Sequence, residues 1–188
     1  MVLIGASLVV NYYAGQYATL KESGPVTDLI LSNIRVYDVD GIFVYGSIAL
    51  WIFVGLLCLL KPNRIPFLLK SIALFILIRS IFVILTHVGP FPTQMPVESD
   101  VLAKFTFGGD LFFSGHTGLP FLMALLFWRE HLLRYFFIFA SVGFGIVVLL
   151  AHLHYSIDVL SAFFITYGIY EMAKIFFTHD FLLFHETR

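Results

Sequence analysis

The sequence predicts an all-α membrane protein, a polytopic bundle of six transmembrane helices, and three observations support this. Sixty per cent of the 188 residues are hydrophobic and only 12% are charged, against about 45–50% and about 25% in soluble domains. The mean hydropathy is +0.94, and a soluble core of this length cannot bury so much apolar surface. The apolar residues also form runs of about 20, the length of a membrane helix, rather than the roughly ten-residue alternation of a membrane barrel.

Six runs approach that length, at about residues 2–18, 41–60, 66–88, 111–128, 132–151 and 157–177. The first is short and contains Asn11 and Gln16. Two longer connections, residues 19–40 and 89–110, contain Gly and Pro residues that indicate turns. No internal repeat divides the chain, so we predict a single membrane domain over residues 1–188.

Composition also excludes several classes of protein. So apolar a chain is not intrinsically disordered. The net charge of −1 and the lack of a basic patch argue against nucleic-acid binding. The single cysteine, Cys58, excludes a disulfide scaffold and a cysteine-based zinc site.

The basic residues predict the orientation in the membrane. One face, formed by the loops 19–40 and 89–110 and the turn near 152–156, carries three of them: Lys21, Arg35 and Lys104. The other face, which includes both termini, carries seven: Lys61, Arg64, Lys70, Arg129, Arg134, Lys174 and Arg188. Because cytoplasmic loops are enriched in Lys and Arg, we expect both termini in the cytoplasm and the first face outside it.

Two polar clusters lie on that extracytoplasmic face. Residues 108–117 open the fourth span and include Asp110, Ser114, Gly115 and His116. Residues 152–158 join the fifth and sixth spans and include His152, His154, Tyr155 and Asp158. A single histidine at a membrane rim is most often only hydrogen-bonded. Two clusters that the topology brings to one side and a similar depth favour a functional site, because polar groups in a bundle are costly.

The spacing of these residues suggests their roles. His154 and Asp158 are i and i+4, so on a helix they share a face and the carboxylate can orient the imidazole. A histidine held in this way is a nucleophile or a general base, and His116 can supply the leaving group with a proton. The helix start at Ser114 and Gly115 offers N–H groups to a phosphate. We therefore predict phosphoryl transfer.

Other interpretations remain open. Two histidines and one aspartate can bind a divalent metal, but no second carboxylate cluster or cysteine supports this, and we expect neither a metal nor a cofactor. His152 is interpreted as a bystander. Arg79, inside the third span, is equally compatible with a phosphate-binding cation and with a structural salt bridge to an acid on a neighbouring helix.

The two clusters resemble motifs of the type 2 phosphatidic acid phosphatase (PAP2) superfamily of six-helix membrane enzymes, and more closely its sphingomyelin synthase branch. Residues 109–117 resemble the third motif of that branch, and residues 151–159, continuing to 162–166, resemble the fourth. Residues 79–86 resemble the second motif, and Gly24–Asp28 is a looser echo of the first. The resemblance implies a PAP2-like core over nearly the whole chain.

The resemblance also implies a mechanism. His154 attacks the phosphorus of a phospholipid donor with the help of Asp158, and His116 protonates the departing diacylglycerol. A lipid alcohol such as ceramide then accepts the headgroup, while water in its place gives hydrolysis. We assign substrate binding to Arg79, Asp110, Ser114, Gly115 and Tyr155. The family site faces away from the cytoplasm, toward the periplasm for a bacterial inner membrane, the lumen for a Golgi membrane or the cell exterior for a plasma membrane.

Departures from the superfamily pattern favour the transferase. Ordinary lipid phosphatases of the superfamily carry a Lys…Arg-Pro motif and a Ser-Arg pair before the second histidine. This chain has no such motif, and Val147 and Val148 stand in place of the pair. A hydrolase on the same scaffold is the second hypothesis. A non-catalytic transporter or scaffolding protein is the third, although transporters more often have helices broken near the midplane.

Overall fold

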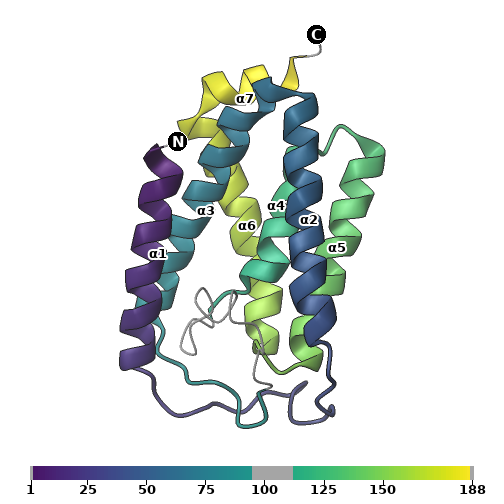
Figure 1. Cartoon of the computed structure of the whole chain (residues 1–188). Coiled ribbons are helices and arrows are strands. Elements are labelled where there is room, and N and C mark those ends of the chain that lie inside the picture. The colour runs from purple at the N-terminus through teal and green to yellow at the C-terminus, as the bar shows by residue number, and fades with distance from the viewer. Residues whose placement is uncertain (1, 95–111, 187–188) are drawn as a thin grey trace.

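The computed structural model describes residues 2–94 and 112–186, and within them the chain forms seven α-helices and no strand. Six helices run alternately up and down the bundle: α1 (Val2–Leu20), α2 (Asp40–Leu60), α3 (Ile65–Leu85), α4 (Gly115–Leu126), α5 (His131–Leu150) and α6 (Ser156–Phe176) (Figure 1). A short 3-10 turn, η1 (Pro62–Arg64), joins α2 to α3, and α7 (Thr178–His185) lies across the end that carries both termini. The prediction of an all-helical bundle is confirmed.

Four of the described helical segments are long and apolar enough to cross a bilayer: α2, η1 with α3, α5 and α6. α1 has 19 residues, but polar side chains such as Asn11 and Gln16 leave it less apolar. α4 is apolar but has only 12 residues, about 18 Å at 1.5 Å per residue. The helices thus support an integral membrane protein, with four rather than six of the predicted spans meeting the requirement.

The ends of the helices explain where the predicted boundaries differ. α3 ends at Leu85, three residues before the expected end, because Thr86 is extended (φ −120°, ψ 127°). α4 begins only at Gly115, since Ser114 caps it from an extended conformation. α7 falls in the predicted tail: its eight residues are too few to span a bilayer, and it forms because Phe184 is buried against Phe67 and Phe127.

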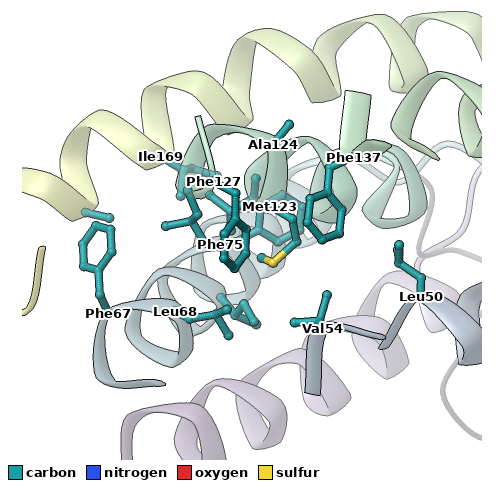
Figure 2. Close-up of a cluster of buried hydrophobic side chains, with 14 of the residues drawn as sticks. Leu50, Val54, Phe67, Leu68, Phe75, Met123, Ala124, Phe127, Phe137 and Ile169 are labelled. Atoms are coloured by element: carbon teal, nitrogen blue, oxygen red, sulfur yellow. The ribbon is translucent and has the colours of Figure 1, made fainter. Parts of the chain in front are cut away.

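Aromatic side chains dominate the core. Phe67, Phe75, Phe127 and Phe137 are fully buried between α3, α4 and α5, with Met123 and Ile169 among them (Figure 2). The backbone of α4 approaches its neighbours closely at Gly118, where a Cβ would lie 2.7 Å from the Phe75 ring and 2.8 Å from the Thr166 hydroxyl. A glycine is therefore required there for α4 to pack between α3 and α6.

The two outer helices are held differently. α1 packs extensively along α3, whereas α2 makes only limited contact, with α5 and η1. The first loop, residues 21–39, then crosses the lower end of the bundle in Figure 1, below the starts of α4 and α6. The fold therefore places that loop, the start of α4 and the α5–α6 turn at one end of the molecule.

Candidate active site

The turn between α5 and α6 carries the histidine–aspartate pair. His154 precedes α6, Tyr155 caps the helix, and Asp158 occupies its third position. The Asp158 Oδ2 atom accepts a hydrogen bond from the Tyr155 N–H at 2.9 Å and lies 3.6 Å from His154 Nδ1. Both side chains are buried. The expectation that the pair shares one helical face is therefore wrong: the contact arises because the carboxylate of Asp158 folds back over the helix start.

The start of α4 packs directly on this turn. The Ser114 N–H donates to the Asp158 carbonyl at 3.1 Å. The Ser114 hydroxyl caps α4 by accepting from the Thr117 N–H at 3.3 Å, and the Thr117 hydroxyl donates to it at 3.2 Å. Ser114 is fully buried. Capping thus fixes the next residues, Gly115 and His116, at the first turn of α4 beside the turn that carries His154.

Arg79 reaches the same place from α3. Its Nε atom donates to the Phe113 carbonyl at 2.9 Å. A Cβ on Gly115 would lie 3.5 Å from that Nε atom, so the side chain of Arg79 runs along the backbone at the α4 N-terminus. The positive end of a helix and a guanidinium side by side form a site that favours an anion.

A cavity of about 440 Å³ joins these groups. Arg79, His116 and His154 all line it, although they come from α3, α4 and the α5–α6 turn. Most of the remaining wall is apolar, with Leu50 and Trp51 from α2 and Phe75 from α3 among its residues. The volume lies within the range of about 300–1,000 Å³ that is typical of ligand pockets. The cavity therefore offers a polar end for a phosphate and an apolar remainder for a lipid.

Most of the other predicted site residues do not line the cavity. Gly115 lines the cavity, whereas Ser114 and Asp158 act behind it through the contacts described above. The Tyr155 hydroxyl donates to the Gly89 carbonyl at 2.8 Å and accepts from the Val26 N–H at 3.3 Å, which ties the turn to two loops away from the cavity. Burial raises the pKa of Tyr155. Asp110 lies outside the described residues.

The structure adds Asp28, which sequence reasoning noted only as the end of the loose first motif. Its Oδ2 atom accepts from the Ser156 N–H at 2.7 Å and the Ser156 hydroxyl at 2.8 Å. Its Oδ1 atom accepts from the N–H groups of Ile30 and Leu31, at 2.8 and 3.0 Å. Burial alone would raise the pKa of Asp28, but these bonds outweigh it and lower the pKa. Asp28 thus fixes the first residue of α6, two positions after His154.

His152 lies beside the site but does not line the cavity. Its backbone has φ 55°, and its Nδ1 atom lies 2.6 Å from the Thr93 hydroxyl. The ring meets Phe91 edge-on, and burial lowers the pKa of His152. These contacts anchor the turn. Gln94, in the same loop as Thr93, does line the cavity, although nothing in its sequence context marked it.

Two further predictions concern charge and metal binding. Val147 and Val148, at the positions of the superfamily Ser-Arg pair, lie in a small apolar cluster with Phe43 and Leu153. That position therefore supplies no cation to the site. Across residues 2–94 and 112–186, no group of three His, Cys, Asp or Glu side chains gathers where it could hold a metal ion.

Comparison with known proteins identifies one match. Residues 108–175 match the family model described as PAP2 superfamily C-terminal. No curated protein and no solved structure matches the chain. The matched segment covers a little over a third of the chain, from the start of the first polar cluster to near the end of α6. It includes His116, His154 and Asp158, and this match of the histidine-bearing segment supports the PAP2 superfamily.

Proposed function

We propose that the protein is a membrane enzyme that transfers the phospho-headgroup of a glycerophospholipid to a lipid alcohol of the ceramide type. One observation carries the proposal: His116, His154 and Arg79 line one cavity whose remaining wall is mostly apolar. The PAP2 match supports the coarser class of lipid phosphatases and phosphotransferases. Within that class, the sphingomyelin synthase-like transfer is our specific proposal.

The chemistry proceeds in two displacements. In the first, His154 attacks phosphorus through Nε2, because Nδ1 faces Asp158. A P–N bond forms, the P–O bond to diacylglycerol breaks, and the leaving oxygen takes a proton from His116. In the second, the acceptor hydroxyl returns a proton to His116 and its oxygen attacks phosphorus, which breaks the P–N bond. Arg79 and the start of α4 stabilise the phosphoryl oxygens.

The distance between His154 and Asp158 fits this mechanism. At 3.6 Å it is longer than a hydrogen bond. Catalytic hydrogen bonds are often long without substrate and tighten when it binds. We therefore expect Asp158 to stabilise the imidazolium character that develops on His154.

A hydrolase is the second candidate, since water can replace the lipid alcohol in the second displacement. The mainly apolar wall of the cavity favours the lipid alcohol. In either case we propose that both termini lie in the cytoplasm and that the site faces away from it. Reporter fusions at the C-terminus and within residues 29–36 test that orientation directly.

The test of the function uses the full chain, purified in detergent, with a fluorescent ceramide and a panel of phospholipids. Wild type is compared with His154→Ala and with His179→Ala, a matched control on the exposed face of α7. We expect a new phospho-ceramide with wild type and His179→Ala, and none with His154→Ala. Diacylglycerol formed without phospho-ceramide identifies the hydrolase. Identical products from all three proteins contradict His154 as nucleophile.

A further inference from the structure

The end of α5 has a backbone in which glycine is the usual residue. The His152 N–H donates to the Leu149 carbonyl at 3.0 Å, and the Leu153 N–H donates to the Val148 carbonyl at 2.9 Å. These are the two hydrogen bonds of a Schellman motif, which places the residue after the helix in the left-handed region. That residue is His152, with φ 55°. Because a Cβ atom is disfavoured in this conformation, the surroundings of the His152 side chain must stabilise it.

The His152 ring joins the α5–α6 turn to the segment that follows α3. Only 3% of the residue is exposed. The Nδ1 atom lies 2.6 Å from the Thr93 hydroxyl, and the ring meets Phe91 edge-on with the ring centroids 5.4 Å apart. The Nε2 atom is buried and has no hydrogen-bond partner among the described residues, which is a further cost. The contacts with Thr93 and Phe91 therefore offset two unfavourable features of His152.

Three residues of the segment after α3 contact the turn. The Gly89 carbonyl accepts a hydrogen bond from the Tyr155 hydroxyl at 2.8 Å. The Phe91 ring packs edge-on against the rings of both His152 and Tyr155. Thr93 binds His152. The segment and the turn are thus connected at several points, and the contact of Thr93 with His152 is the one that lies nearest to His154 along the turn.

This contact connects two parts of the cavity wall from behind. Neither Thr93 nor His152 lines the cavity, but Gln94, the residue after Thr93, does, and so does His154, two residues after His152. Gln94 is held beside Thr93 by a turn in which its N–H donates to the Phe91 carbonyl at 2.8 Å. The contact between Thr93 and His152 therefore restricts the movement of His154 relative to the wall at Gln94.

We propose that His152 is a positioning residue that, through its contact with Thr93, holds His154 in place for attack on phosphorus. The inference rests on the proposed function, because it concerns the nucleophile of that reaction. It gives a role to a histidine that takes no part in the bond changes. Asp28 fixes the turn from the first loop, whereas His152 fixes it from the segment after α3.

Substitutions of His152 separate the ring from the backbone. His152→Gly suits the Schellman motif but removes the ring, so we expect kcat for headgroup transfer to fall about tenfold and KM to stay within about twofold of wild type. His152→Asn also adopts a positive φ and keeps a polar atom near the position of Nδ1, so it should restore kcat to within about threefold of wild type. His179→Asn, on the exposed face of α7, is the matched control. A lower Tm with unchanged kcat in His152→Gly indicates a structural role alone and overturns the proposal.

Substitutions of Thr93 test the same contact from its other side. Thr93→Val has the shape of threonine but no hydroxyl, so it covers Nδ1 of His152 without offering it a partner and should also lower kcat about tenfold. Thr93→Ser keeps the hydroxyl and should keep the activity. Thr178→Val removes a hydroxyl that bonds the Lys174 carbonyl at the opposite end of the bundle, and it is the matched control.

The double variant shows whether the two residues act through one contact. His152→Gly combined with Thr93→Val should cost no more than the larger of the two single losses, because residues in contact are not additive. Additive losses in the double variant, or an unchanged kcat in Thr93→Val, overturn the proposal.

A spectroscopic measurement tests the position of His154 without turnover. In the full chain labelled with ¹⁵N-histidine and placed in nanodiscs, the imidazole signals of His154 are identified by their loss in His154→Ala. We expect these signals to move in Thr93→Val and to stay in place in Thr178→Val. Movement in a protein whose wild type transfers no headgroup contradicts the proposed function and leaves the positioning of His154 standing. Headgroup transfer by wild type with unmoved His154 signals in Thr93→Val contradicts the positioning role alone.

Discussion

The two ends of the bundle are built from different interactions. At the end that carries the candidate site, buried polar groups form hydrogen bonds with one another: Asp28 with Ser156, Ser114 with Thr117, and Tyr155 with Gly89. At the opposite end, Arg64 pairs with Glu130 and lies over the rings of Phe127 and Phe184. Lys70 pairs with Asp180 of α7.

This difference predicts how substitutions at the two ends will act. Hydrogen bonds are directional, and buried ones restrict the positions of the atoms that they join. Aromatic packing and ion pairs near the surface hold elements together and tolerate small shifts. Substitutions at the active-site end should therefore change activity more than stability, and those at the opposite end the reverse.

The largest effect is expected at the histidines. His116→Ala and His154→Ala should each lower the turnover number at least about a thousandfold, because each removes a group that forms or breaks a bond. The double substitution should cost little more than either alone, since residues that act as a unit are not additive. Stopped-time assays of headgroup release measure this. Activity within tenfold of wild type in either variant contradicts the assignment.

Arg79 comes next. Arg79→Leu removes the cation at the α4 N-terminus and should lower kcat/KM by about a hundred- to a thousandfold. Arg79→Lys keeps the charge but loses the donor geometry of the guanidinium, so it should restore activity only in part. A structural role alone predicts a fall in thermal stability with unchanged kcat/KM, and thermal melting in detergent separates the two outcomes.

Asp28 separates the effect of positioning His154 from that of contacting the substrate, because Asp28 does not line the cavity. Asp28→Asn removes the negative charge and replaces one acceptor oxygen with a donor, which faces the Ser156 N–H and removes that hydrogen bond. We expect a roughly tenfold fall in kcat with little change in KM, since His154 shifts while the cavity stays intact. Ser156→Ala removes a single bond and should have a smaller effect. An equal fall for both variants argues against positioning through Asp28.

The pH dependence of stability supplies a second readout for Asp28. Its pKa is lowered from the ordinary value of 3.8. The stabilisation is therefore complete above about that pH and is lost as pH falls through the folded-state pKa. The difference in Tm between wild type and Asp28→Asn should be constant near neutral pH and should shrink below about pH 4.

The smallest effect on activity is expected at the opposite end. Arg64→Met removes the ion pair with Glu130 and the contact with two aromatic rings, and it should lower stability by about 1 kcal/mol. Turnover should not change. Differential scanning fluorimetry and the headgroup assay measure the two quantities together. A fall in turnover larger than about twofold means that the two ends are coupled.

Much of this arrangement could be predicted from the sequence. Runs of about 20 apolar residues located α2, α3, α5 and α6, because a bilayer fixes helix length. The alternation of those runs brought residues 108–117 and 152–158 to one side. In the structure, His116 and His154 line the same cavity, in agreement with the expectation that the two segments lie on one side.

Other features depend on contacts that no local pattern shows. α7 forms because the Phe184 ring packs against the Phe67 ring. Long-range packing of this kind cannot be recognised from the periodicity of a single sequence. Asp28 reaches Ser156 across 128 residues of chain. The helical spacing of His154 and Asp158 predicted that the two side chains lie close together, but a capping carboxylate and not a shared helix face brings them together.

The separation of α1 from α2 has a consequence for how the rate depends on the lipid. α1 packs on α3, and α2 on α5 and η1, so the two helices, which both line the cavity, do not pack along one another. A substrate that passes between them arrives by diffusion in the plane of the bilayer. If the protein has the proposed function, the quantity that saturates it is then the mole fraction of substrate among the lipids, and adding inert lipid at constant bulk concentration should lower the rate.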